Sequence, residues 1–212
     1  MNFRPEWIAP VRTALLLIDC QADFGAPHGE MARRGMDMSA PQAALDEAVR
    51  LLEAARGAGV MPVFVRLLTL PGTESEVLKE AKRRKSDPQE GDLCVAGTPG
   101  AAFVTVRPRG REWIVDKTRY SAFTGIDLAG RLKAEGIDTL VLAGLTTECC
   151  VAATAWSAFE ADFHVFLAGD ACAAYDDGLH RGALRALECS GAIVLPAGRI
   201  AEIWEDSNRS VT

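Results

Sequence analysis

Short apolar runs and longer segments of helical periodicity alternate along the whole chain. A run of four to eight apolar residues that is bounded by Gly, Pro or charged residues is typical of a strand buried on both faces of a sheet. The run Thr-Ala-Leu-Leu-Leu-Ile-Asp at residues 13–19 is a clear example. On this pattern we predict six strands, at residues 13–19, 61–68, 112–116, 139–143, 164–168 and 192–195.

Segments between these strands carry apolar residues at the three- and four-residue spacing of an amphipathic helix. After Ser39, the expected N-cap, Leu45 and Leu52 belong to such a pattern, which continues to Gly57 or Gly59. We predict further helices at residues 127–135, from about residue 150 onward, at 178–190 and at about 197–205.

Three segments lack a clear periodic pattern. Residues 20–38 contain three glycines and a proline and are expected to form a long loop, and residues 206–212 are expected to form a polar, frayed tail. Residues 69–111 are irregular apart from a candidate polar helix at 74–85. Insertions of this length in compact domains are often lids or binding loops, so we treat residues 69–111 as a candidate lid or binding insertion.

Strands and helices alternate from one end of the chain to the other, which predicts an α/β fold. The expected architecture is a three-layer α/β/α sandwich around a mostly parallel, six-stranded, Rossmann-like sheet with right-handed crossovers. The sequence shows neither an internal repeat nor an interdomain linker, so we expect one domain over residues 1–212.

Composition narrows the range of partners. Of the 212 residues, 49% are hydrophobic and 25% are charged, and the net charge is −6. This acidic balance provides no basis for binding nucleic acids or anionic membranes, and no apolar run is long enough to span a bilayer. The basic run at residues 82–85 could contact a polyanion, but a solvated helix face balanced by nearby acidic residues is the favoured interpretation. The opening residues, MNFRPEW, lack the apolar region of a signal peptide, so we expect a cytoplasmic protein.

The stretch from Asp138 to Val151 predicts a strand, a tight turn at Gly144 and then a helix that opens near Cys150. A thiol at a helix N-terminus lies among unpaired backbone N–H groups, which favour the thiolate. The arrangement is that of a nucleophile elbow with sulfur in place of oxygen. The alternative is that Cys150 is a small buried apolar residue, as free cysteines often are.

Two other strands end in reactive groups. Asp19 closes the first strand, and Lys117 follows the third strand directly. Ligands bind at the carboxyl ends of strands in sheets of this kind, so we expect Asp19, Lys117 and Cys150 to meet at one edge. Asp19 could take the thiol proton and pass it to a leaving amine, Lys117 could orient the carboxylate, and the N–H groups of Thr146 and Cys150 could bind an oxyanion. Taken singly, Asp19 could instead cap a helix and Lys117 could be solvated.

Three motifs carry a family resemblance: D-x-Q-x-D-F at residues 19–24, K-x-x-Y-S-A-F at 117–123 and G-L-T-T-E-C-C-V at 144–151. Together they resemble the isochorismatase-like cysteine hydrolases, over about residues 13–195. This superfamily includes nicotinamidases, N-carbamoylsarcosine amidases, and ureidoacrylate and biuret amidohydrolases. The resemblance implies that Cys150 is the nucleophile, with Asp19 and Lys117 as its partners, and that the Leu145–Thr146 peptide bond is cis.

The resemblance also bears on the substrate. It places Phe24 and Tyr120 in the pocket and favours a small carboxamide or ureido substrate, hydrolysed without a cofactor. Arg66 or Arg119 could pair with an anionic substrate group, although each could equally be a structural ion-pair partner. A nicotinamidase-type amidase and a catalytically silent small-molecule-binding relative remain alternatives.

Departures from the family pattern concern the metal and the assembly. The loop after the second strand has no histidine, and we expect His28, His164 and His180 to be structural or exposed rather than metal ligands. Relatives commonly carry Arg-Asp where this chain has Trp156-Ser157. The family suggests a homo-oligomer, a dimer or tetramer, for which the aromatic side chains Trp156, Phe159 and Trp204 are candidate interface residues, although burial in the core is the alternative.

Overall fold

The computed structural model describes residues 3–70, 72, 75–84 and 93–209. Its centre is a six-stranded sheet with the strand order β3-β2-β1-β4-β5-β6, and every neighbouring pair is parallel. The strands are β1 (Thr13–Ile18), β2 (Met61–Leu67), β3 (Trp113–Lys117), β4 (Thr139–Leu145), β5 (His164–Ala173) and β6 (Ile193–Leu195). The predicted α/β sandwich with a parallel sheet is confirmed.

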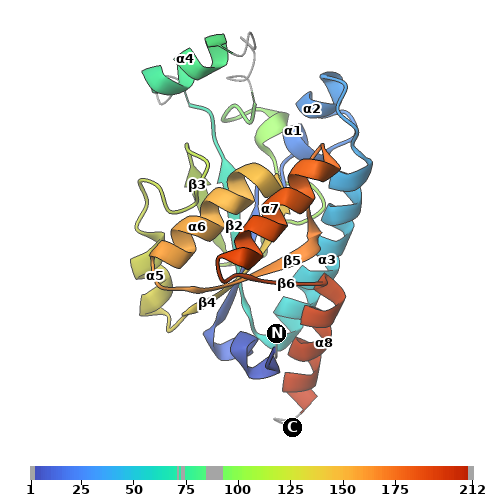
Figure 1. Ribbon diagram of the computed structural model, residues 1–212, viewed down its shortest axis with the longest axis vertical. Coiled ribbons are helices and arrows are strands. Elements are labelled where there is room, and N and C mark those ends of the chain that lie inside the picture. The colour runs from blue at the N-terminus through green and yellow to red at the C-terminus, as the bar shows by residue number, and fades with distance from the viewer. Residues whose placement is uncertain (1–2, 71, 73–74, 85–92, 210–212) are drawn as a thin grey trace.

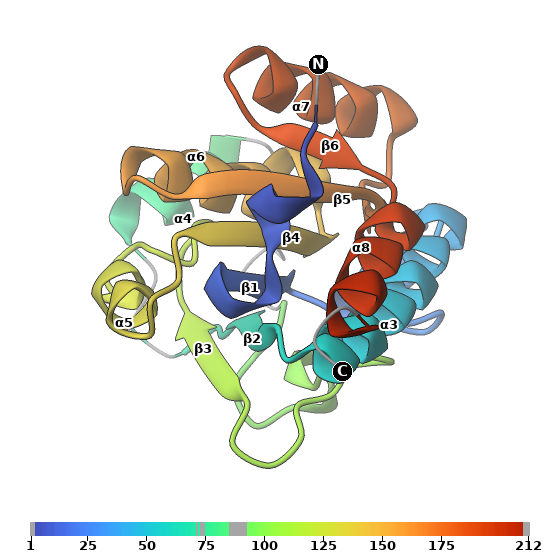
Figure 2. The same ribbon diagram turned by 90° about the horizontal axis from the view of Figure 1, so that it is seen from below.

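Helices cover both faces of the sheet (Figure 2). On one face lie α3 (Ser39–Ala58) and α8 (Ala197–Arg209); on the other lie α5 (Leu128–Ala134), α6 (Ala152–Glu160) and α7 (Asp177–Cys189). Successive side chains of a strand point to opposite faces, so β1 contributes Leu15 and Leu17 to the first core and Leu16 and Ile18 to the second. This two-sided burial explains why β1 is apolar throughout.

Strand order reverses between β1 and β4, because the chain proceeds outward from β1 to β3 and then returns to the other side of β1. Ile18 at the end of β1 pairs with Gly144 near the end of β4, and Leu67 at the end of β2 pairs with Lys117. The carboxyl ends of these strands therefore lie at one edge. This is the position where ligands bind in open parallel sheets.

Several predicted boundaries are wrong. Residues 20–38 are not a continuous loop, because two short helices, α1 (Ala22–Gly25) and α2 (Glu30–Arg33), form within them. Ser39 does not cap α3: the cap position is Met38, and the Ser39 N–H instead donates to Asp37 Oδ1. Helix α8 continues to Arg209, so the predicted frayed tail begins too early; residues 210–212 lie outside the described part of the chain.

The fifth strand is five residues longer than predicted. The pairing of β4 with β5 shifts register after Leu142, so that Leu167 pairs with Leu142 while Cys172 pairs with Gly144. This irregularity accommodates Gly169 and Asp170, the two residues that ended the apolar pattern. The strand thus reaches the same sheet edge as β1 and β4.

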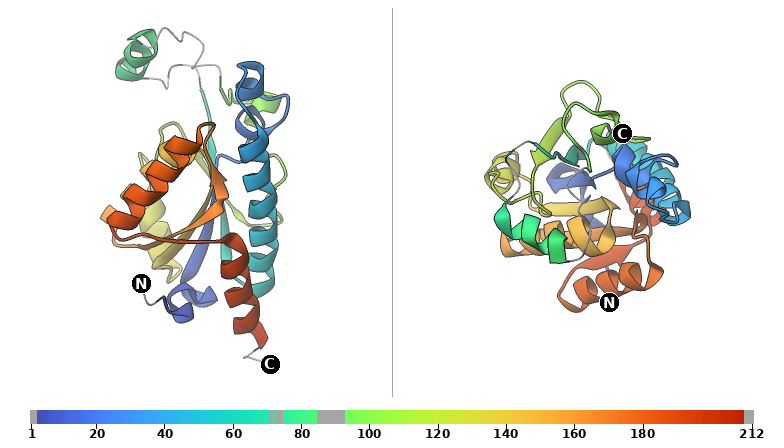
Figure 3. Two further views of the ribbon diagram at one scale, coloured as in Figure 1. Left: turned by 45° about the vertical axis from the view of Figure 1, so that its right-hand side comes forward. Right: turned by 90° about the horizontal axis from the view of Figure 1, so that it is seen from above.

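The irregular insertion at 69–111 is tied to the carboxyl edge at several points. The Ala22 N–H donates to the Ala102 carbonyl, the Val104 N–H donates to the Cys20 carbonyl, and a 3₁₀ turn, Pro99–Ala101, lies near α1. The predicted polar helix is present as α4 (Glu76–Arg84), although part of the predicted range lies outside the described residues. Figures 1 and 3 show α4 standing away from the sheet, at the end of the molecule that carries α1 and α2.

The three candidate interface aromatics have different positions. Trp204 is fully buried, and its indole N–H donates to the Ile8 carbonyl, so it belongs to the core. Trp156 and Phe159, on α6, are 41% and 48% exposed.

No helix in the described ranges combines the length and apolar character that crossing a membrane requires.

Candidate active site

Asp19 lies immediately beyond β1 in a conformation that L-residues rarely adopt. Its φ is +50°, and its N–H donates to the Val65 carbonyl of the neighbouring strand. Non-glycine residues in this region are held there by the surrounding structure and are concentrated at functional sites. The side chain is fully buried, and Oδ1 has no hydrogen-bond partner among the described residues.

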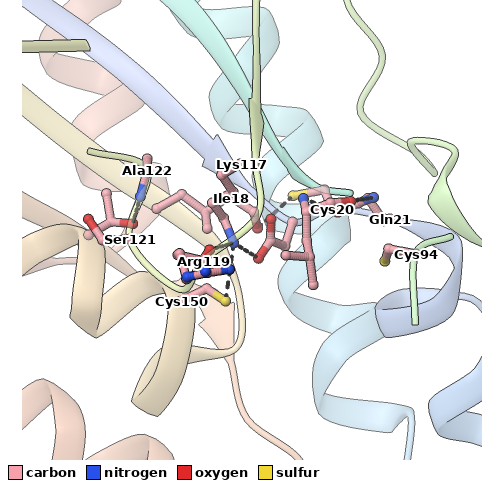
Figure 4. Close-up of polar contacts among 12 residues, drawn as sticks. Ile18, Cys20, Gln21, Cys94, Lys117, Arg119, Ser121, Ala122 and Cys150 are labelled. Carbon is pink, nitrogen blue, oxygen red and sulfur yellow. Dashed lines mark hydrogen bonds and ion pairs between the residues drawn. The ribbon is translucent and has the colours of Figure 1, made fainter. Parts of the chain in front are cut away.

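The Lys117 ammonium lies between Asp19 and Cys150. Figure 4 shows Lys117 beside Arg119 and Cys150. Nζ donates to Asp19 Oδ2 at 2.7 Å, to Cys150 Sγ at 3.3 Å and to the Arg119 carbonyl at 3.1 Å. An ammonium has three N–H donors, so these contacts use its full capacity. The side chain is fully enclosed, unlike that of a solvated lysine.

Cys150 is presented by a close approach of β4 to β1. A Cβ on Gly144 would lie 2.0 Å from the Ile18 carbonyl oxygen, and the φ of Gly144 is +126°, so only glycine fits this position. The following Leu145–Thr146 peptide bond is cis. The helix opens near Cys150 as expected, and its first turn is π-helical: Thr147–Val151 forms this turn and α6 follows it.

The combined effect of burial and the neighbouring side chains is to raise the pKa values of both acids, Asp19 and Cys150. Burial raises the pKa of Asp19, and the charge of Lys117 and its hydrogen bond offset this only in part. For Cys150, the hydrogen bond with Cys149, burial and the negative charge of Asp19 together raise the pKa well above that of a free thiol, although Lys117 acts in the opposite direction. The expectation that the helix N-terminus would favour a resting thiolate is therefore wrong, because these effects outweigh it.

The pKa of Lys117 shifts in the direction that preserves its charge. Burial by itself would lower this pKa, but the charges of Asp19 and Cys150 reverse the effect and raise it. The site therefore holds an ammonium between the Asp19 side chain and the Cys150 sulfur. Such a site can move the thiol proton to the carboxylate when a substrate arrives.

A cavity of about 440 Å³ opens beside Cys150. The structure brings Phe24, Arg119 and Tyr120 to its wall, together with Thr146. The insertion contributes lining residues as well: Thr69, Leu78 and Leu93. The volume suits a small molecule rather than a polymer.

Arg66 does not reach this cavity. Its guanidinium makes two hydrogen bonds to the Asp116 carboxylate, at 2.6 and 3.1 Å, and lies over the Phe103 ring. The structural ion pair that the sequence left open is therefore the arrangement observed, and we do not retain Arg66 as a substrate-binding residue.

Two side chains of the first motif, the amide of Gln21 and the carboxylate of Asp23, hold the backbone around the cavity in place. Gln21 donates to the carbonyls of Leu67 and Ala101 and accepts from the Leu67 N–H, which joins β1, β2 and the insertion. Asp23 accepts the Cys94 N–H at 2.7 Å. These contacts explain the D-x-Q-x-D spacing: the first residue faces the thiol, and the other two fix the surrounding backbone.

The K-x-x-Y-S-A-F segment is held against α6. Ser121 donates its hydroxyl to Ser157, and the Ala122 N–H donates to the Thr154 hydroxyl. Ser157, where relatives commonly carry an acid, thus binds the loop that carries Arg119 and Tyr120. This contact requires only a hydroxyl and no ion pair.

The cavity residues that sequence reasoning missed include Glu148 and Tyr175. The Tyr175 hydroxyl donates to the Phe24 carbonyl at 2.8 Å. Tyr175 lies just past the end of β5, a position that would have indicated a site residue. The prediction ended this strand at residue 168, so this position was not recognised. Glu148 was visible inside the third motif but was given no role.

The three histidines are dispersed. His28 and His164 are exposed, and His164 begins β5 as expected. His180 Nδ1 lies 2.8 Å from the Thr147 hydroxyl, and burial lowers its pKa. Over the described ranges, no group of three or more His, Cys, Asp or Glu residues is arranged to hold a metal ion.

A parallel sheet with an acid, an ammonium and a thiol at its carboxyl edge, beside a small cavity, is the architecture of a small-molecule enzyme. A family model described as the isochorismatase domain matches residues 13–198. The chain therefore belongs to the isochorismatase family, and the predicted class of enzyme, an isochorismatase-like hydrolase, is confirmed.

Individual relatives agree with this assignment. The chain is 31% identical over 202 residues to the ureidoacrylate amidohydrolase RutB of Methylobacterium radiotolerans, with coverage of 87% of this chain and 77% of the relative. N-carbamoylsarcosine amidase from Thermoplasma acidophilum is 26% identical with a TM-score of 0.68, over 88% of this chain and 96% of that one. A cysteine hydrolase from Pseudomonas syringae pv. phaseolicola has a TM-score of 0.81 at 22% identity, over 98% and 96%, and supports the fold alone.

Proposed function

We propose that this protein hydrolyses a C–N bond in a small carboxamide or ureido compound, with Cys150 as nucleophile, Asp19 as general acid and base, and Lys117 as the orienting cation. The observation that carries the proposal is the Lys117 ammonium, 2.7 Å from Asp19 Oδ2 and 3.3 Å from Cys150 Sγ. The names of the relatives, a ureidoacrylate amidohydrolase and an N-carbamoylsarcosine amidase, support this substrate class.

The first half of the reaction forms a thioester. Asp19 takes the thiol proton as Cys150 Sγ bonds to the carbonyl carbon, and the backbone N–H groups of Thr146 and Cys150 bind the oxyanion. The tetrahedral intermediate collapses, the C–N bond breaks, and Asp19 returns the proton to the departing nitrogen. A raised pKa suits Asp19 to both roles, because the group must hold and then release the same proton.

In the second half, water cleaves the thioester. Asp19, again ionised, takes a proton from the water as its oxygen attacks the acyl carbon. The C–S bond breaks, the proton passes to sulfur, and the acid is released, which for a ureido substrate is a carbamate. Lys117 remains charged throughout, because its pKa is raised by its two partners.

Ammonia release across ureas, carbamoyl acids and carboxamides, nicotinamide included, tests the proposal. We expect Cys150→Ala to abolish turnover while its circular dichroism matches the wild type, and we expect acid-quenched wild-type protein to carry an acyl adduct on Cys150 by mass spectrometry. Full activity in Cys150→Ala would exclude the mechanism. Tight ligand binding without ammonia release from any compound would favour the silent-relative alternative.

We also propose a homo-oligomer. The exposed aromatic rings of Trp156 and Phe159 lie on the same helix, α6, and are its candidate contact residues. Light scattering of the wild type and of Trp156→Ser/Phe159→Ser checks this assignment: a smaller species is expected for the variant, and a monomeric wild type would contradict it.

A further inference from the structure

Glu148 lines the cavity and has a buried carboxylate oxygen without a hydrogen-bond partner among the described residues. The residue lies in the π-helical turn two positions before Cys150 and contributes to the cavity wall. Oε1 accepts the Thr146 hydroxyl at 3.0 Å, which holds the carboxylate in place. Oε2 is buried and has no hydrogen-bond partner among the described residues. A buried acceptor without a partner is costly, so its presence at the cavity calls for an explanation.

Hydroxyl donors near Glu148 are already engaged elsewhere. The Thr146 hydroxyl is bound to Oε1, and the Tyr175 hydroxyl donates to the Phe24 carbonyl. The Thr147 hydroxyl is paired with His180. These three hydroxyls are therefore not available to Oε2, and an N–H group of a molecule bound in the cavity that Glu148 lines is the donor considered below.

The chemistry of a carboxylate restricts that molecule. Ionised Glu accepts hydrogen bonds and donates none, so it favours an N–H group and disfavours another anion or a carbonyl oxygen. With the scissile carbonyl carbon at Cys150 Sγ, a ureido compound offers an N–H on both sides of that carbon. A carboxamide offers one only on the leaving side, because carbon occupies the other.

We propose that Glu148 is a specificity-determining residue that accepts a hydrogen bond from the retained nitrogen of a ureido substrate, and so selects ureido compounds over carboxamides. This inference rests on the proposed function and decides between the two substrate classes that the function leaves open. A buried acceptor discriminates against an analogue without the donor, because that analogue leaves the acceptor unpaired.

The matched probes are β-ureidopropionate and glutaramate, which differ only in the exchange of that NH for CH₂. We expect wild-type kcat/KM to favour β-ureidopropionate by about 10- to 100-fold, the range of one hydrogen bond to a charged group. Glu148→Ala should reduce this preference to near unity, mainly through a higher KM for β-ureidopropionate. Glu160→Ala is the control: Glu160 is an exposed acid on α6 outside the cavity wall, so the preference should be retained.

Binding separates this inference from the proposed function. Calorimetry on Cys150→Ala and on Cys150→Ala/Glu148→Ala measures recognition of the two probes without turnover. The expected result is a preference for β-ureidopropionate that disappears with the second substitution. Equal binding of the two probes by Cys150→Ala, or a preference that survives loss of Glu148, would overturn the role of Glu148. Selective binding with no ammonia release from either probe would refute the hydrolytic function alone.

Discussion

The Lys117 ammonium lies 2.7 Å from the Asp19 carboxylate, and both side chains are completely enclosed. A pair of this kind costs desolvation energy that its mutual attraction has to offset. Its presence at the carboxyl edge of the sheet, in contact with a thiol, is explained by the reaction more readily than by stability. The pair nevertheless has a consequence for stability, because among the described residues Lys117 contacts no second carboxylate and Asp19 contacts no second cation.

Replacing one member of the pair should destabilise the protein more than replacing both. Lys117→Met leaves the Asp19 carboxylate buried without a cation, and we expect a loss of about 3–5 kcal/mol in the free energy of unfolding. Asp19→Leu should be similarly destabilising. The double variant should lose less than either single change, because no unpaired charge remains. Urea denaturation of the four proteins measures the coupling, and additive losses would contradict it.

As the pH falls, activity should be lost at a pH above the ordinary pKa of an aspartate. Asp19 acts as a base only when ionised, and burial raises its pKa from 3.8. The active fraction therefore rises with pH through this raised pKa, and activity is lost on acidification before an ordinary carboxyl group would protonate. The profile of kcat/KM against pH measures this limb, with circular dichroism at each pH to exclude unfolding. A limb at or below pH 3.8 would contradict the prediction.

Asp19→Asn should separate thiolate formation from turnover. The negative charge of Asp19 raises the pKa of Cys150, whereas Lys117 lowers it, so removing the charge leaves the ammonium to stabilise the thiolate. We expect faster alkylation of Cys150 by iodoacetamide at neutral pH together with loss of hydrolysis. Exposed Cys189 is the internal control and should react equally in both proteins. Slower alkylation of Cys150 in the variant would show that Asp19 activates the thiol at rest.

Gly100 should not tolerate a methyl group. A Cβ there would lie 2.2 Å from Asp23 Oδ2, the oxygen that binds the Cys94 N–H. We expect Gly100→Ala to cost about 1–3 kcal/mol, as overpacking does, and to raise KM by displacing the insertion that lines the cavity. The control is Gly57→Ala in α3, where the methyl group meets no atom within 4 Å and should stabilise the helix by up to about 1 kcal/mol. Equal stability of the two variants would refute the packing argument.

The sequence by itself determined the order of the elements and the three reactive positions. Burial on both faces makes a strand such as β1 almost entirely apolar. This pattern is local, so it can be recognised in the sequence without knowing which strands lie beside it. Asp19 and Lys117 were found because they stand where such runs end, and Cys150 because Gly144 marks a sharp turn. The family motifs indicate the same positions, since the proposed chemistry requires those side chains at one edge.

Only the tertiary structure decided how these side chains interact. Arg66 and Arg119 were equivalent in the sequence, but the register of β2 against β3 places Arg66 beside Asp116, while Arg119 lines the cavity. The direction of the Cys150 pKa depends on burial and on Asp19, and a helix N-terminus in the sequence reports neither. The unpaired oxygen of Glu148 is likewise a property of packing. Contacts between residues far apart in the chain set these quantities, and a local pattern does not specify them.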